Sequence, residues 1–188
     1  MKLQLPLGIP TLAGKHVILR PITRDDYKDI FKFQTDMRQL YLWWADRDIL
    51  SFEEFVEDFQ RRLRRFIQTI FIIQSVNEKE PVGMIYSYNA NLIDRYAYLC
   101  VYLSPEYVGK NMGPEASKLF VNYLFQYYGF RKLYAEIISY NQGSLRLARW
   151  NGFVEEGCLK EYRWFGHRYW DLHILSISVE EFIQRMSQ

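Results

Sequence analysis

The chain has 188 residues, of which 49% are hydrophobic and 18% aromatic, and its formal net charge is +2. This length fits a single domain over residues 1–188, and the apolar content supports a packed core and excludes a disordered chain. So small a charge gives no reason to expect binding to nucleic acid or to a membrane. Cys100 and Cys158 stand in no CxxC or Cys/His spacing, so no metal is predicted. The N-terminus has no signal-peptide pattern, which favours a cytoplasmic protein.

The first half of the chain predicts a strand, two helices and three further strands. Residues 15–20 read as a strand that Pro21 ends, and Thr23 is a candidate cap for a helix that opens at Arg24. Ser51 begins the capping-box pattern Ser-Phe-Glu-Glu of a second helix. The strand-like runs that follow are 69–76, 81–88 and 96–103, and the last two are close enough to form a hairpin.

The second half mixes helices and strands without strict alternation. The expected elements are a helix over 114–128, a strand over 132–139, a short helix over 144–150, a hairpin of 154–162 with 168–178, and a helical tail over 179–186. This order predicts a mixed sheet with helices packed on it and argues against a doubly wound dinucleotide fold.

A glycine-containing loop connects the strand that ends at Leu103 to the helix expected at Pro114. The loop contains Gly109 and Gly113, and Lys110 adds a positive charge. Backbone N–H groups in such a loop and the positive end of the helix dipole together form an anion site. Taken alone, the pattern is a weak signal and favours an ordinary helix-opening turn.

A second segment, residues 141–153, follows one strand later and reads Asn-Gln-Gly-Ser, ending in Gly-Phe. Together the two segments resemble the acetyl-CoA-binding region of the GNAT superfamily of N-acetyltransferases. The resemblance covers roughly residues 14–180. Glu156-Gly157 and the closing strand around Asp171 are similar to the subgroup of ribosomal-protein N-terminal acetyltransferases and spermidine acetyltransferases. The resemblance to the GNAT superfamily implies an α+β fold with a mixed, largely antiparallel sheet and helices packed on both faces.

The resemblance also implies roles for individual residues, with acetyl-CoA as co-substrate. The catalytic candidates are Ser144, as proton donor to the leaving thiolate, and Tyr98, which faces the acceptor. Ser144 fits the cap of its own helix equally well, and one serine can do both. A backbone N–H of the strand would polarise the thioester carbonyl. The residues implied in binding acetyl-CoA are Val101, Tyr102, Leu103, Val108, Gly109, Lys110, Asn111, Met112, Gly113, Pro114, Asn141 and Ser144.

Four residues depart from the family pattern. Val108 replaces a preferred Arg or Gln, and Pro114 removes an N–H that could meet a phosphate. Asn111 replaces a Gly, but asparagine tolerates a left-handed backbone better than most residues. Tyr98 stands where the subgroup often has a glutamate base, so deprotonation of the amine runs through water, Glu136 or another residue.

The acceptor side leaves two readings open. The aromatic pair Trp43-Trp44, beside Asp46, forms either an acceptor wall or part of the core. Likewise, Tyr96, Tyr98, Cys100 and Tyr102 share one strand face by alternation, which is either core or the floor of the acceptor pocket.

The expected reaction is direct attack of a primary amine, on a small molecule or a peptide, on acetyl-CoA in a ternary complex. Because no covalent intermediate is needed, Cys100 is expected to be a buried thiol and not a nucleophile. The protein is expected to be a monomer or homodimer. The alternatives are a GNAT-fold acyl-CoA sensor or scaffold without catalysis, and an unrelated binding module.

Overall fold

The computed structural model describes residues 12–42 and 50–186. Within these ranges the strands are β1 (Val17–Pro21), β2 (Ile67–Ser75), β3 (Pro81–Asn91), β4 (Tyr96–Leu103), β5 (Lys132–Ile138), β6 (Val154–Phe165) and β7 (Arg168–Ser178). The helices are α1 (Tyr27–Thr35), α2 (Phe52–Arg65), α3 (Met112–Tyr127), α4 (Gln142–Trp150) and α5 (Val179–Met186), and the short 3-10 turns are η1 (Leu40–Leu42) and η2 (Pro105–Tyr107). The elements follow the order that the sequence predicts.

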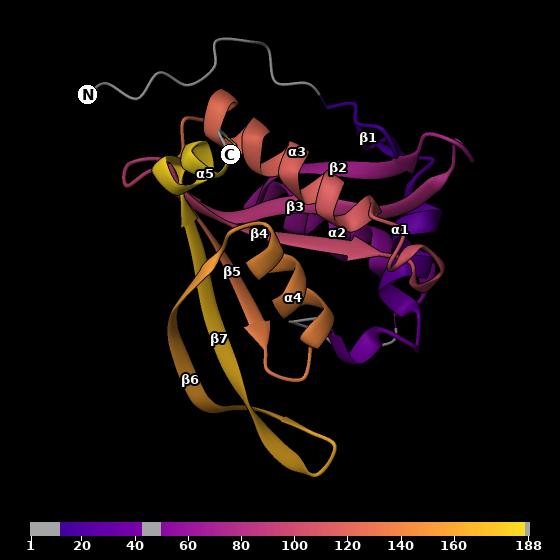
Figure 1. Ribbon diagram of the computed structural model, residues 1–188. Helices are drawn as coiled ribbons and strands as arrows, with labels where there is room; N and C mark the ends of the chain where they lie inside the picture. Colours follow the sequence, from indigo (N-terminus) through magenta and orange to yellow (C-terminus); the bar gives the residue numbers. More distant parts are fainter. Residues whose placement is uncertain (1–11, 43–49, 187–188) are drawn as a thin grey trace.

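All seven strands join one sheet in the order β1-β2-β3-β4-β5-β7-β6. Every neighbouring pair is antiparallel except β4 and β5, which run parallel. This confirms the mixed, largely antiparallel sheet. The predicted hairpins are β3–β4 and β6–β7, and the β6–β7 hairpin extends beyond the rest of the sheet (Figure 1).

Helices pack on both faces of the sheet, as predicted (Figure 1). One face packs against α3, α4 and α5 through a core that includes Phe120, Leu124, Leu145 and Phe182. The other face packs against α1 and α2 through a smaller core. The amphipathic spacing of these helices explains the arrangement, because each places one apolar stripe on the sheet. No helix within the described ranges combines the length and apolar composition of a membrane span.

The local start of α2 matches its sequence signature, whereas the start of α1 does not. Ser51 and Glu54 form the predicted capping box. Helix α1 begins at Tyr27, so Thr23 is not its cap. Instead, the Thr23 N–H and hydroxyl both donate to the buried carboxylate of Asp26, which also forms a bidentate pair with Arg20. This cluster joins β1 to α1, and its hydrogen bonds outweigh burial to hold the pKa of Asp26 below its usual range.

Candidate functional site

Strands β4 and β5 pair over only three residues and then separate. Tyr96, Ala97 and Tyr98 lie opposite Lys132, Leu133 and Tyr134, and no pair follows along the two strands. Beyond this point β4 still pairs with β3, and β5 with β7. Each strand therefore leaves one edge of unpaired backbone groups facing the gap, which is available to a ligand.

The alternation of β4 determines which N–H groups face that gap. The Ser104 N–H donates to Val82 on the β3 side. Because N–H groups alternate along a strand, that of Tyr102 also points to β3, and those of Val101 and Leu103 point to the open edge. The Tyr102 side chain is buried and packs against Phe33 of α1, with ring centroids 5.1 Å apart. Val101 and Leu103 are thus the two predicted strand residues with N–H groups directed to the gap.

The loop after β4 has the backbone that an anion site requires. Gly109 and Asn111 have φ angles of +85° and +62°, which confirms that asparagine adopts the left-handed turn here. Among the described residues, no acceptor contacts the N–H groups of Gly109, Asn111, Met112 or Gly113. Helix α3 begins at Met112, two residues before the predicted start at Pro114. Free N–H groups and a helix N-terminus therefore coincide and fit a diphosphate.

The acidic side chain at the start of α3 does not face the loop. Glu115, in the first turn of α3, points to β1, where its carboxylate accepts the N–H groups of residues 15–17. Val108 is 61% exposed. The ammonium of Lys110 lies 4.8 Å from the ring centroid of Tyr107. A Cβ atom on Gly113 would lie 3.0 Å from Leu103, so glycine at this position lets α3 pack closely on β4.

Helix α4 is capped at its N-terminus by Asn141 and not by Ser144. Asn141 is the N-cap, and its side-chain oxygen accepts the Ser144 N–H at 3.1 Å. The reading of Ser144 as the cap is therefore wrong, because the helix begins at Gln142. The Ser144 hydroxyl has no hydrogen-bond partner among the described residues and remains available to donate a proton.

Six side chains form two rows across the sheet where β4 and β5 separate. Tyr88, Tyr98 and Tyr134 lie opposite one another on β3, β4 and β5, with ring centroids 5.6 and 5.3 Å apart. The next row comprises Tyr86, Cys100 and Glu136, and we call the two rows the tyrosine face. It lies on the α1–α2 side of the sheet, where Tyr86 packs against the smaller core.

Burial controls the protonation of the tyrosine face. It raises the pKa of Glu136, and the Tyr88 hydroxyl, within hydrogen-bonding reach of the carboxylate, partly offsets this. Burial and the charge of Glu136 raise the pKa of Tyr98, which is therefore a phenol at neutral pH and not a base. Burial also raises the pKa of the Cys100 thiol to about 11, in accord with a protonated, non-nucleophilic cysteine.

An aromatic cluster that the sequence patterns did not reveal lies beside the end of β5. The Tyr140 hydroxyl donates to the Tyr41 carbonyl at 2.6 Å, and the Tyr41 ring stacks on Phe165 at 5.5 Å. Tyr140 also meets Trp170 edge-on at 5.2 Å. These contacts join the end of η1 to the β6–β7 hairpin. The segment with Trp43, Trp44 and Asp46 follows η1 directly but lies outside the described residues.

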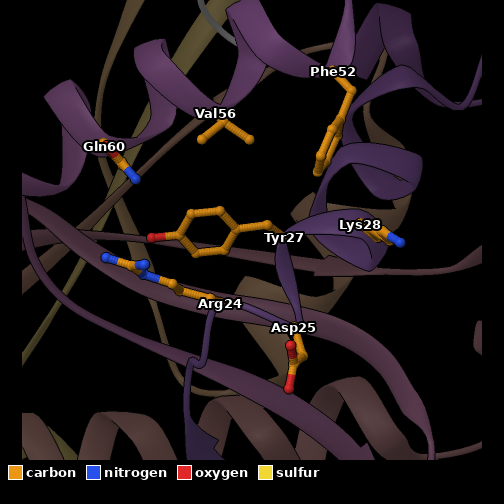
Figure 2. A pocket seen from close by; sticks show the side chains of 7 residues that line it. All are labelled: Arg24, Asp25, Tyr27, Lys28, Phe52, Val56 and Gln60. Carbon is orange, nitrogen blue, oxygen red and sulfur yellow. The ribbon is translucent and has the colours of Figure 1, made fainter.

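A separate depression of about 490 Å³ lies between α1 and α2. Figure 2 shows the Tyr27 ring at its centre, between Arg24 and the α2 side chains Val56 and Gln60. Its lining includes no residue of the tyrosine face or the Gly109–Gly113 loop. The depression is therefore distinct from the site at the β4–β5 gap.

Comparisons with known proteins agree with this geometry. A family model described as an acetyltransferase (GNAT) domain matches residues 16–154. The spermidine N(1)-acetyltransferase of Vibrio cholerae serotype O1 is 25% identical over 172 residues, which cover 92% of this chain and 98% of that protein. The Escherichia coli K12 enzyme of the same name is 25% identical over 77% of this chain and 76% of its own length.

The same fold occurs in a solved structure. The crystal structure of a spermidine N-acetyltransferase from Vibrio cholerae, in complex with CoA and spermine, superposes with a TM-score of 0.80. The alignment covers 89% of this chain and 98% of that chain, at 23% identity.

Proposed function

The chain belongs to the GNAT acetyltransferase family and transfers the acetyl group of acetyl-CoA to an amine, and we propose that this amine belongs to a polyamine. The observation that carries the proposal is the half-buried Glu136 carboxylate among tyrosines, where the sheet opens between β4 and β5. Aromatic faces and a carboxylate both attract ammonium groups. The names of the two spermidine acetyltransferase relatives support the same acceptor class.

In this proposal the chain binds acetyl-CoA along the gap and over the loop after β4. The N–H groups of Val101 and Leu103 at the open edge of β4 donate hydrogen bonds to the pantetheine arm, and Asn141 at the start of α4 also contacts that arm. The diphosphate lies on the free N–H groups between Gly109 and Gly113. Acetyl-CoA supplies an acetyl thioester, whose carbonyl oxygen accepts one of the two strand N–H groups as negative charge develops.

Two side chains transfer protons in this proposal, and a third orients the amine. Glu136 takes the proton from the acceptor ammonium, because its raised pKa brings it closer to the pH at which a base must act. The neutral amine nitrogen forms the new C–N bond, the carbon–sulfur bond of the thioester breaks, and the proton that the nitrogen then loses replaces the one that Ser144 gives to the thiolate. Ser144 donates a proton to the departing thiolate, while the Tyr98 phenol orients the amine by accepting or donating a hydrogen bond.

The test measures CoA thiol release with a panel of amines at a fixed, saturating acetyl-CoA concentration. Spermidine and spermine are expected to give kcat/KM at least ten-fold above a monoamine of similar length, an aminoglycoside and a peptide with a free N-terminus. A higher kcat/KM for the peptide or aminoglycoside would contradict the polyamine assignment. Calorimetric binding of CoA without thiol release from any amine would instead favour the sensor or scaffold.

A further inference from the structure

Three side chains with metal-binding atoms meet on the β6–β7 hairpin, away from the tyrosine face. They are Glu155 and Cys158 of β6 and His173 of β7. Their ligand atoms all lie within 4.8 Å of one another. His173 Nδ1 lies 3.1 Å from a carboxylate oxygen of Glu155. The acetyl-transfer site uses none of the three.

A β-bulge creates this cluster. Glu155 and Cys158 are three residues apart, so in a regular strand their side chains would point to opposite faces. The register between β6 and β7 shifts after Glu155, which pairs with Leu175, whereas Gly157 pairs with Ile174. The extra residue in β6 brings Glu155 and Cys158 to the same face, where Cys158 lies directly opposite His173. Sequence spacing could not reveal this set, because no local motif encodes the bulge.

The imidazole of His173 has one polar neighbour at Nδ1, the Glu155 carboxylate. Nδ1 is buried and forms no hydrogen bond within the described residues, although a carboxylate oxygen of Glu155 lies 3.1 Å away. A buried polar atom without a hydrogen bond costs free energy. A metal ion between Nδ1 and the carboxylate would satisfy both groups.

We propose that Glu155, Cys158 and His173 form a binding site for a zinc-like divalent cation. Thiolate, imidazole and carboxylate are established zinc ligands, with bonds of about 2.0–2.3 Å. Tetrahedral bonds of that length separate ligand atoms by about 3.5 Å, so ligand atoms that now lie within 4.8 Å of one another approach by about 1 Å when the ion binds. The thiolate selects against magnesium and calcium, which prefer oxygen ligands. Three protein ligands leave a fourth position open to water.

Two ion pairs lie beside the proposed site. Arg149 pairs with the second carboxylate oxygen of Glu155 at 3.5 Å, and Lys160 pairs with Asp171 at 2.9 Å. Binding of the ion releases the thiol proton of Cys158. The ion then joins β6 to β7 across the bulge.

The test uses the untagged full chain and cobalt(II), a coloured probe for zinc sites. We expect one cobalt per chain, with a thiolate-to-cobalt charge-transfer band and tetrahedral visible bands that zinc abolishes. Cys158→Ser should remove the charge-transfer band, and His173→Ala should weaken zinc binding at least ten-fold in competition with a chromophoric chelator. Cys100→Ser and His167→Asn are the matched controls and should retain the band.

Glu155→Gln keeps the proposal testable if the other variants misfold, because Glu155 is exposed and its substitution should not disturb folding. It should also weaken zinc binding at least ten-fold while the protein melts cooperatively. Zinc should raise the melting temperature of the unaltered chain and of Cys100→Ser, but not of Cys158→Ser. A missing charge-transfer band in the unaltered chain, or an equal band in Cys158→Ser, would overturn the proposal.

Discussion

At the scale of single residues, the burial of Glu136 lowers the stability of the folded chain but suits a catalytic role. A carboxyl group whose folded-state pKa is raised destabilises the folded chain once it ionises, so this loss grows as pH rises through the raised pKa. Buried groups that are costly in this way concentrate at functional sites. Asp26 has the opposite behaviour, because its lowered pKa stabilises the fold above the unfolded pKa and the benefit is lost as pH falls.

Tyr88→Phe tests the coupling between the tyrosine hydroxyl and Glu136. The hydroxyl favours the charged carboxylate, so its removal should raise the pKa of Glu136 further. If Glu136 is the base, kcat/KM for spermidine rises with pH through this pKa. The rising limb of the pH profile should therefore move to higher pH in Tyr88→Phe. Tyr96→Phe, on the strand face of β4 that carries Tyr98, is the control and should leave the rising limb in place. A rising limb that does not move in Tyr88→Phe would contradict the coupling between Tyr88 and Glu136.

The residue scale also shows which assignments local sequence can support. Asn111 in a left-handed turn and the Ser51 capping box follow from the chemistry of single side chains, and both predictions are confirmed. The cap of α4 was one of two readings left open for Ser144, because serine suits that position, but Asn141 is the cap. Thr23 was similarly misjudged, since its N–H and hydroxyl donate to Asp26, which also pairs with Arg20 of β1.

At the scale of elements, the loop between β4 and α3 depends on its backbone conformation. Gly109 and Gly166 form a useful pair, because each has a positive φ and each offers open space to an added Cβ. Alanine at either position should therefore cost a similar strain of about 1–2 kcal/mol. Only Gly109 lies in the loop that we propose binds the diphosphate.

Gly109→Ala should weaken CoA binding about ten-fold, because the strained loop no longer aligns its free N–H groups, and about 1.4 kcal/mol corresponds to a factor of ten. Gly166→Ala should lose comparable stability and keep its CoA affinity. Calorimetric titration with CoA and thermal melting measure the two effects. An equal loss of affinity in both variants, or in neither, would show that the loop does not bind the diphosphate. Gly113 is a poorer choice, since any side chain there meets Leu103.

At the scale of the whole molecule, the order of elements and the mixed sheet followed from the sequence, whereas the arrangements between distant strands did not. Hydrophobic periodicity marks an element but does not state where two strands stop pairing. The separation of β4 from β5 after Tyr98, the bulge at Glu155 and the rows of the tyrosine face all arise from long-range register. The sequence named Tyr98 and Glu136 as candidates, but only the sheet brings them together.

The proposed site depends on the sheet, which brings the parts that bind acetyl-CoA and the tyrosine face to the same gap between β4 and β5. The open edge of β4, the loop before α3 and the start of α4 surround one side, and the tyrosine face forms the other. Those parts come from segments far apart in the chain, so direct attack in a ternary complex relies on the fold to bring both substrates together. One domain over residues 1–188 remains a prediction, as does the cytoplasmic location.

The role of Glu136 as the base is tested by the rate of spermidine-dependent CoA thiol release by Glu136→Gln. Glutamine keeps the size of the side chain and can still accept the Tyr88 hydrogen bond, but it cannot take a proton. We predict that kcat/KM falls by at least about 100-fold, while CoA affinity is unchanged and the melting temperature at neutral pH is not lowered. A Glu136→Gln protein that acetylates spermidine at the rate of the unaltered chain would contradict the central claim that Glu136 is the base.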